Sequence, residues 1–336
     1  MASKAHEHAL LSQTERTQYM LQLSKVVQET GEHVLHIDRE KIFDTVEVAR
    51  HQFSTVDAEA SSKLRAVLER ELTAFPGTVL EESEIPRALL EAGRLTYPLL
   101  LCDAVEGSTN AKRGLAAYLR RPILAGTLAM IVESEELCMI AASAFYDFAS
   151  QKVFASVRTE TGCFLAFIDG QIVAQMHVVE TKGDSHAYAI APGYSHANVE
   201  ARATVERALL SAGIESAGGS RSSAQDLVNL LCNQADAYVD LRALFPGSTE
   251  SRDEVLHTWD VGGLLPILDS VGFRITDATG QLSWQRLRIW DRLAIVVARP
   301  MLQSRILEAL RALPFVAALL APQEQNIVPY PTPALG

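Results

Sequence analysis

The sequence has few cysteines and no long apolar run, and each shortage narrows the class of protein. It contains 4 cysteines among 336 residues, without the CxxC spacing of a zinc site. Scattered cysteines among apolar neighbours are typical of reduced, buried thiols in the cytoplasm. No stretch reaches the ~18 apolar residues of a membrane span, and the N-terminus lacks the apolar core of a secretory signal. We therefore expect a cytoplasmic protein without a membrane partner.

Positive charge is also scarce. Lys and Arg number 30 against 41 Asp and Glu, which gives a formal net charge of −11. Because binding to a nucleic acid backbone needs clustered Lys and Arg, nucleic acid is excluded as the main partner. A small phosphate ligand stays open, since bound divalent cations can invert the local field. The composition is otherwise that of a globular chain, with 48% hydrophobic residues.

The most informative stretch of the chain combines acids with a polar turn. A short apolar run, residues 97–101, predicts a buried strand, and Asp103 and Glu106 follow it. A Gly-Ser-Thr-Asn turn, residues 107–110, comes directly afterwards. Carboxylates offer oxygen ligands to a hard cation, and such a turn aims backbone N–H groups at an anion. A cation site beside an anion site is the requirement of phosphoryl chemistry.

Three segments of this chain resemble the motifs of one family. Residues 103–110, DAVEGSTN, resemble the Asp-Pro-Ile-Asp-Gly-Thr-Thr-Asn motif of the inositol monophosphatase and fructose-1,6-bisphosphatase superfamily. Residues 79–83 resemble its Gly-Glu-Glu segment, and residues 259–263 resemble its Trp-Asp-x-Ala-Ala segment. The matches occur in the family's order and extend over most of the chain. The resemblance implies a magnesium-dependent, lithium-sensitive phosphatase of small phosphorylated molecules.

The resemblance also implies a fold, a layered αβαβα sandwich of mixed α+β and α/β type. We expect an antiparallel sheet in an N-terminal subdomain, residues 1–184, because serial hairpins such as the one at Asp169-Gly170 follow residue 123. A mixed sheet is expected in a C-terminal subdomain, residues 185–321. Helices are expected over residues 1–52 and 58–74. The Pro- and Gln-rich residues 322–336 predict a mobile tail.

A set of metal ligands follows from the resemblance. Asp103 would bridge two ions, Val105 would add its carbonyl oxygen, and Glu81, Glu106 and Asp260 would complete the coordination. The resemblance implies two or three Mg²⁺ ions, with Mn²⁺ as a substitute. The residue types agree, because carboxylates without a His or Cys pattern favour a hard cation over Zn²⁺.

The resemblance further assigns the catalytic groups. Ser108 and Glu81 would orient the attacking water, and the backbone N–H groups of Gly107, Ser108 and Thr109 would bind the phosphate. Two roles stay open for Asp57, a helix cap and a contact with the catalytic hydroxyl network. Asp240 and the polar segment of residues 242–257 are the candidates for contacts with the leaving group of the substrate.

The chain departs from the family motif at two positions, where Ala104 replaces proline and Glu106 replaces aspartate. The added methylene of Glu106 moves its carboxylate by ~1.5 Å, which bears on the second metal. Our first hypothesis is a Mg²⁺-dependent phosphomonoesterase of an inositol phosphate or a sugar phosphate. A sugar bisphosphate and a 3′-phosphonucleotide are alternative substrates. The second hypothesis is a non-catalytic family member that binds a phosphorylated ligand or a partner. In either case we expect a homodimer.

Overall fold

The structure is a computed structural model. It describes most of the chain, in ranges that are separated by gaps. All structural observations concern the described residues. The described ranges are 10–38, 45–48, 51–85, 96–116, 123–173, 187–192, 199–245 and 255–320.

The first half of the chain forms a large sheet with helices on one face. Its elements in order are α1 (Gln13–Leu35), β1 (Thr45–Val48), β2 (His51–Ser54), α2 (Thr55–Glu71), β3 (Thr78–Glu81), the 3-10 turn η2 (Glu82–Glu84), β4 (Leu99–Glu106), α4 (Ser108–Ala116), β5 (Gly126–Val132), the 3-10 turn η4 (Leu137–Met139), β6 (Ile140–Asp147), β7 (Lys152–Arg158), β8 (Phe164–Ile168) and β9 (Gln171–Ile172).

Seven strands make up this first sheet, in the order β3-β4-β5-β6-β7-β8-β9. All neighbouring pairs are antiparallel except β3 and β4, which run parallel. The sheet is therefore antiparallel as predicted, apart from its β3 edge. The hairpin predicted at Asp169-Gly170 joins β8 to β9, and both residues have the positive φ of a two-residue hairpin turn.

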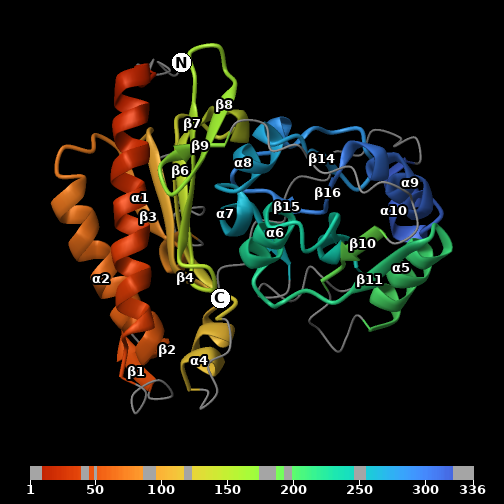
Figure 1. Cartoon of the computed structure of the whole chain (residues 1–336), viewed down its shortest axis with the longest axis horizontal. Coiled ribbons are helices and arrows are strands. Elements are labelled where there is room, and N and C mark those ends of the chain that lie inside the picture. The colour runs from red at the N-terminus through yellow and green to blue at the C-terminus, as the bar shows by residue number, and fades with distance from the viewer. Residues whose placement is uncertain are drawn as a thin grey trace, which may run out of the picture.

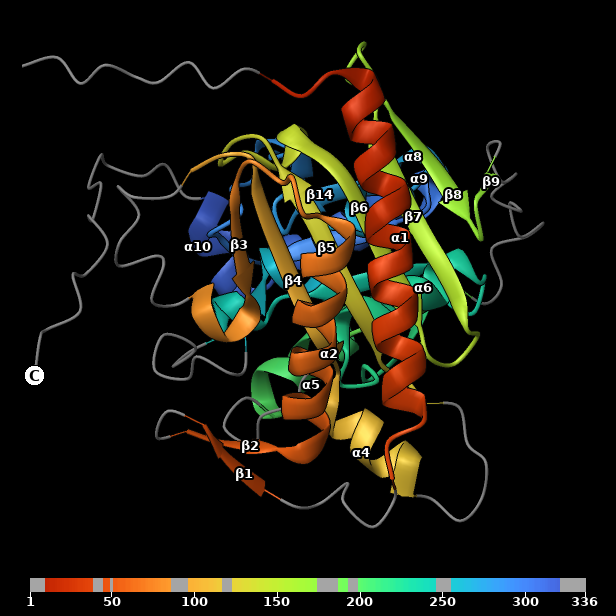
Figure 2. The same cartoon turned by 90° about the vertical axis from the view of Figure 1, so that its left-hand side faces the viewer.

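Helices α1 and α2 lie side by side across one face of the first sheet (Figure 2). A capping box at Ser12 and Glu15 fixes the start of α1. Further along, Gly31 lets α1 approach β6, because a Cβ at this position would lie 2.2 Å from the ring of Tyr146. The buried apolar side chains of both helices and of the sheet form one core, centred on Leu23, Val27, Leu64 and Ile131.

The second half of the chain forms a smaller sheet between two groups of helices. Its elements in order are β10 (Ala187–Ile190), α5 (Val199–Ser211), β11 (Ile214–Ala217), α6 (Ser223–Leu231), β12 (Ala237–Asp240), the 3-10 turn η6 (Arg242–Leu244), β13 (Leu256–His257), α7 (Thr258–Val261), α8 (Leu265–Ser270), β14 (Arg274–Asp277), the 3-10 turn η8 (Trp284–Arg286), β15 (Arg292–Leu293), β16 (Ile295–Ala298), α9 (Pro300–Arg311) and α10 (Pro314–Leu320).

The second sheet has the order β11-β10-β12-β16-β14, and it is mixed. Strands β11, β10 and β12 run parallel, and β16 pairs antiparallel with both β12 and β14. Helices α6, α7 and α8 lie between the two sheets, and α5, α9 and α10 cover the far face (Figure 1). These five layers are the αβαβα sandwich that the sequence predicted.

The central layer holds the largest apolar core, which joins the two halves of the chain. Side chains of β4 and β5, such as Leu101 and Met130, pack there with residues of α6 and α8, such as Leu227 and Leu268. The predicted subdomain boundary near residue 185 and the predicted tail, residues 322–336, both lie outside the described residues. Among the described helices, none is long and apolar enough to cross a membrane.

One predicted element is wrong. The helix expected over residues 1–52 ends at Leu35, and residues 45–48 and 51–54 form an antiparallel pair of strands, β1 and β2. Thr45, Val46 and Val48 are β-branched, and such side chains favour a strand when no amphipathic helix pattern opposes it. The cysteines are free thiols as expected, although Cys163 and Cys232 are exposed.

Candidate active site

A β-bulge at the end of β4 aims two acids at the same side of the sheet. Asp103 pairs with Leu128 and Glu106 pairs with Gly126, so β4 has one more residue than β5 across this step. In a regular strand, residues three positions apart point to opposite faces, and the extra residue restores a common face. The bulge is held by a hydrogen bond from the Val105 N–H to Asp103 Oδ1, 2.9 Å. Both carboxylates therefore face the second half of the chain.

The Glu-Glu pair divides between the two faces of the same sheet. Glu81 pairs in register with Cys102 of β4 and so faces α2. There the buried Glu81 carboxylate accepts hydrogen bonds from the hydroxyl of Ser61 and from the guanidinium of Arg65. Glu82, at the start of η2, belongs to the opposite face, where its carboxyl is hydrogen-bonded to Asp103. The residue that joins the Asp103 cluster is Glu82.

Asp260 approaches this cluster from the second half. It stands in the first turn of α7, which packs against β4. Its Oδ2 accepts a hydrogen bond from the His257 N–H, 2.8 Å, which fixes the carboxylate at the helix start. The rings of His257 and Trp259 stack with their centroids 4.2 Å apart. The Trp-Asp motif thus delivers an acid to the junction of the halves.

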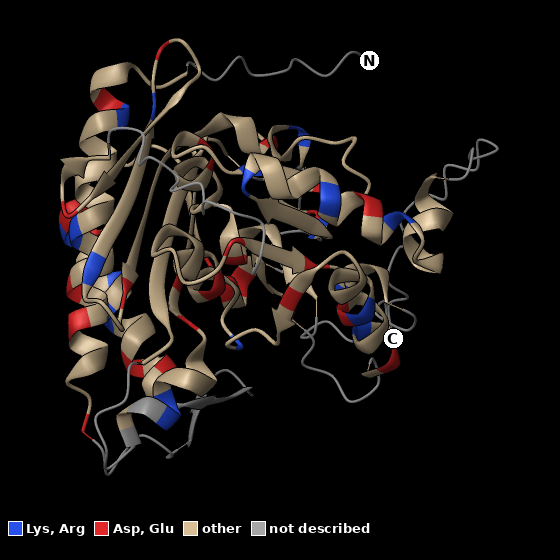
Figure 3. Ribbon diagram, turned by 45° about the vertical axis from the view of Figure 1, so that its right-hand side comes forward, with Lys and Arg blue, Asp and Glu red and all other residues tan. Residues whose placement is uncertain are grey.

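Four acids from three segments therefore share one electrostatic site. Burial raises the pKa of Asp103 well above its ordinary value, and the charges of Glu82, Glu106 and Asp260 raise it further. Burial also raises the pKa of Asp260, again with help from Glu106 and Glu82. The pKa of Glu82 rises to about 7, first through burial and then through Glu106 and Asp57. Figure 3 shows acidic residues of different elements gathered between the two halves.

Glu82 combines two properties that differ at first sight. Its side chain is exposed to solvent, yet protein surrounds its carboxyl closely enough to raise its pKa. Glu82 therefore lies at the solvent-exposed edge of the acidic site.

The four acids offer only oxygen ligands, and their negative charges are incompletely balanced. Arg242 lowers the pKa of Glu106 and of Asp260. Its effect on each carboxyl is smaller than that of burial and of the nearer neighbours. A hard divalent cation such as Mg²⁺ fits this donor set and would relieve the repulsion. In the part of the chain that the structure describes, no three His, Cys, Asp or Glu side chains already converge on one point as a ligand set. The residues fit a cation by the chemistry of their donor atoms.

The turn after Glu106 begins a helix. Gly107 has φ +85°, and α4 starts at Ser108. The Gly107 carbonyl accepts hydrogen bonds from the N–H groups of Asn110 and Ala111, so the N–H groups of residues 107–109 precede the helical ladder. N–H groups at such a position, together with the helix dipole, attract anions. Gly107 and Ser108 are half-buried and Thr109 is exposed.

Two further residues link this helix to its surroundings. Asn110, the last residue of the motif, donates from Nδ2 to the carbonyls of Leu124 (2.8 Å) and Ser220 (2.6 Å). It therefore ties α4 to the second half of the chain. Asp57 lies in the first turn of α2, and its carboxylate pairs with Lys112 Nζ of α4 at 3.4 Å. Asp57 also raises the pKa of Glu82, which places it at the edge of the acidic site.

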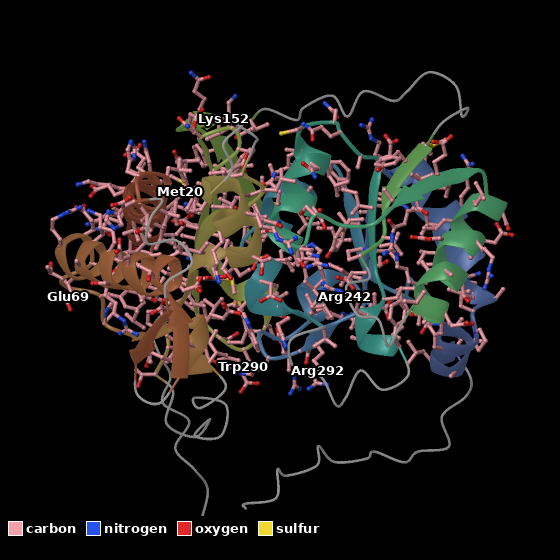
Figure 4. All side chains as sticks on the ribbon, turned by 90° about the horizontal axis from the view of Figure 1, so that it is seen from below. Met20, Glu69, Lys152, Arg242, Trp290 and Arg292 are labelled. Atoms are coloured by element: carbon pink, nitrogen blue, oxygen red, sulfur yellow. The ribbon has the colours of Figure 1, made fainter. Side chains whose placement is uncertain are left out.

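Asp240 is buried and its carboxylate is saturated by neighbours. It accepts hydrogen bonds from the Tyr238 hydroxyl, 2.8 Å, and from the Arg242 backbone N–H, Nε and Nη2. The guanidinium also donates to Ser223 Oγ at the start of α6, 3.1 Å. Arg242 lies in the interior beside the second sheet (Figure 4). Asp240 thus holds Arg242, and Arg242 is the member of this pair whose charge reaches the acids.

Sequence reasoning gave no weight to several of these residues. The motif assigned the metal and water contacts to Glu81 and not to Glu82, because the choice between them depends on the register of β3 and β4. Arg242 belongs to the candidate segment 242–257, but the sequence did not single it out within that segment. Asn110 is part of the motif itself, and its contact with Ser220 depends on the tertiary structure alone.

Comparison with known proteins identifies the fold. An IMPase of Thermotoga maritima superposes with a TM-score of 0.59 at 14% identity, covering 88% of this chain and 97% of that one. A staphylococcal inositol monophosphatase in a lithium chloride-soaked inhibitory complex gives 0.58 at 13% identity, with coverages of 91% and 98%. An IMPase/NADP phosphatase complexed with Mg²⁺ and phosphate gives 0.54 at 14%, with 84% and 92%.

No protein-family model matches the sequence, and no curated protein sequence matches it. The protein has the fold of the inositol monophosphatases. This confirms, at the level of fold, the resemblance that the three motifs indicated.

Proposed function

We propose that this protein is a divalent-cation-dependent phosphomonoesterase of a small phosphorylated metabolite. The observation that carries the proposal is the electrostatic coupling of Glu82, Asp103, Glu106 and Asp260 beside the turn at Gly107, where α4 starts at Ser108. A carboxylate site for a hard cation and an N–H site for an anion then lie one residue apart in the chain. Hydrolysis of a phosphate ester needs both.

Each residue has a role in this proposal. Asp103, Glu106, Asp260, Glu82 and the carbonyl of Val105 would hold Mg²⁺, with Mn²⁺ as a substitute, in two or three sites. Glu82 takes the place that the sequence gave to Glu81, because Glu81 is engaged on the α2 side. When bound, the cation lowers the pKa of water and offsets the charge of the phosphate.

The polar groups of the turn complete the site. The N–H groups of Gly107, Ser108 and Thr109 would bind the phosphate oxygens. The Ser108 hydroxyl would orient the attacking water, and Asp57 would keep Lys112 and α4 in place. No covalent nucleophile is required. Arg242, the first residue of the candidate segment 242–257, is the better candidate for contact with the leaving group, since the Asp240 carboxylate is used by Arg242 itself.

Two neighbours support this chemistry. The IMPase/NADP phosphatase is complexed with Mg²⁺ and phosphate, and the staphylococcal enzyme with its lithium soak is an inhibitory complex. We therefore propose an inositol phosphate or a sugar phosphate as the substrate, with a sugar bisphosphate or a 3′-phosphonucleotide as alternatives. The homodimer and the cytoplasmic location stay predictions from the sequence.

The test is phosphate release from a panel of small phosphate esters with Mg²⁺, with Mn²⁺ and with EDTA. Asp103→Asn and Asp260→Asn should each remove most turnover. Glu69→Gln is the control, because Glu69 lies on the exposed side of α2, away from the junction of the halves (Figure 4). Release that persists in EDTA, or that survives Asp103→Asn, would refute the proposal. Tight binding of a phosphate ester without release would favour the non-catalytic alternative.

A further inference from the structure

Glu106 makes a contact that its counterpart in the family motif, a shorter aspartate, is not long enough to make. Its Oε1 accepts a hydrogen bond from the Ser223 N–H, 2.9 Å, and one from the Ser222 hydroxyl, 3.3 Å. The N–H of Ala224 also favours the ionised form of this carboxylate. These donors form the start of α6, more than 110 residues further along the chain. A side chain of the first half therefore caps a helix of the second half.

The helix start is fixed from its other side as well. Ser222 is the N-cap of α6, and its hydroxyl oxygen accepts from the Gln225 N–H, 3.2 Å. Ser223 Oγ accepts from Arg242, which Asp240 holds. The N–H groups of a helix start are short of acceptors, and a carboxylate is the preferred partner because the helix dipole stabilises negative charge there. Glu106 supplies that carboxylate.

The length of the side chain decides whether this contact forms. An aspartate at position 106 would withdraw its carboxylate by ~1.5 Å, which stretches a 2.9 Å hydrogen bond beyond normal hydrogen-bond distance. The backbone at position 107 already lies close to Ser222, the N-cap of α6, which limits how far it can move towards the helix. A Cβ on Gly107 would lie 2.7 Å from Ser222 Cβ. Only the longer side chain spans the gap.

We infer that Glu106 is a positioning residue, an inter-half strut that caps α6 and holds it against the acidic site. The extra methylene of this chain is then a structural requirement. If Glu106 served only as a cation ligand, the stability of the metal-free protein would not depend on the length of this side chain. The capping of α6 by Glu106 does not depend on the proposed activity.

The first test uses the protein in EDTA and measures its unfolding temperature. Glu106→Asp keeps the charge and loses the reach, so it should lower the unfolding temperature by about 2–4 °C, the effect of a lost helix cap. Glu69→Asp is the matched control, since it shortens an exposed acid of α2 and should change nothing. Because Ser222→Ala also removes the local cap, the double variant with Glu106→Asp isolates the contact between the two. The double variant should unfold at a higher temperature than the sum of the single effects predicts.

The second test uses Mn²⁺ binding, measured by calorimetry, and this part rests on the proposed function. Ser222 would not touch the cation, but it positions Glu106. Ser222→Ala should therefore weaken Mn²⁺ binding up to about tenfold in the wild-type background, as outer contacts of metal sites do, and have no effect in Glu106→Asp.

The outcomes of the two tests separate the claims. An unchanged unfolding temperature of Glu106→Asp in EDTA, or strictly additive effects with Ser222→Ala, would overturn the strut. An equal effect of Ser222→Ala on Mn²⁺ binding in both backgrounds would overturn the positioning role. If the wild type binds no Mn²⁺ at all, the proposed function fails, and the measurements in EDTA still decide the strut.

Discussion

Alanine at position 107 tests how closely the two halves meet at the proposed phosphate turn. Gly107 has φ +85°, which costs an L-residue roughly 1–2 kcal/mol. The added Cβ would also lie 2.7 Å from Ser222 Cβ and 3.3 Å from the Leu124 carbonyl oxygen. Overpacking of this kind costs about 1–3 kcal/mol. We therefore expect Gly107→Ala to lower the free energy of unfolding by about 2–5 kcal/mol.

Gly162 is a matched control for the backbone part of this cost. It has φ +83° in the turn between β7 and β8, and a Cβ there would meet nothing within 4 Å. Gly162→Ala should cost only the roughly 1–2 kcal/mol of the dihedral angle. Urea unfolding of both variants measures the difference, which is the contact between Gly107 and Ser222. Equal costs in the two variants would show that the halves are not packed together at this turn.

The same pair of variants also tests the turn in catalysis. Alanine at Gly107 must push the helix start away from Ser222, and displacements near 1 Å at a reacting group cost up to ~10²-fold in rate. Below its unfolding transition, Gly107→Ala should lose at least about tenfold of phosphate release, and Gly162→Ala should keep the wild-type rate. Normal turnover of folded Gly107→Ala would remove the turn from the proposed site.

Other predictions concern the acids. Asp103→Asn should raise the unfolding temperature in EDTA, because it removes a repelling charge, and should abolish phosphate release; a lowered temperature would contradict the repulsion. Glu82→Gln should abolish turnover, whereas Glu81→Gln should chiefly destabilise the protein. Kinetics and urea unfolding of both variants test this. Loss of turnover in Glu81→Gln alone would contradict it. In EDTA the folded state holds the proton of Glu82 up to a pKa of about 7, against an ordinary value of 4.5. The contribution of Glu82 to stability should thus be greatest below pH 4.5 and be lost as the pH rises to about 7, and denaturation of Glu82→Gln should lack this contribution. Asp240→Ala leaves the charge of Arg242 buried and should cost about 3–5 kcal/mol, so a cost under ~1 kcal/mol in urea unfolding would argue against a buried ion pair.

The five-layer fold could be predicted because three short motifs carry the resemblance that implies it, and local patterns agree with its antiparallel sheet. Alternating hydrophobic runs, hairpin signals such as Asp169-Gly170 and the three motifs each concern neighbours in the chain. The β1–β2 pair was missed for the opposite reason. Each of these strands has four residues, too few for a period to decide between helix and strand.

The site was predictable in its residue types and less so in its individual members. Asp103, Glu106 and Asp260 lie close enough to raise one another's pKa, and their roles stay a proposal. The choice between Glu81 and Glu82 needs the parallel register of β3 on β4. A shift of one residue turns a side chain to the other face, and the sequence of either strand alone does not fix that register. The roles of Asp240 and Glu106 likewise depend on partners in distant segments.

Asp103, Glu106 and Asp260 are each fixed by a backbone hydrogen bond, which explains how these like charges can lie close together. In each of three cases one carboxylate oxygen accepts from a backbone N–H: Asp103 from Val105, Glu106 from Ser223, and Asp260 from His257. Backbone donors are fixed by the fold, so repulsion between the acids cannot easily turn these side chains away.

This anchoring also determines which substitutions probe charge alone. The amide oxygen of Asn or Gln can still accept from the same N–H, so the anchor survives when the charge is removed. Alanine leaves a buried N–H unpaired, at a cost of about 1–3 kcal/mol. The isosteric amides therefore test the chemistry of the site, and the alanine variants test its scaffold. A site in which Asp103→Ala and Asp103→Asn had the same stability would not be anchored to its backbone in this way.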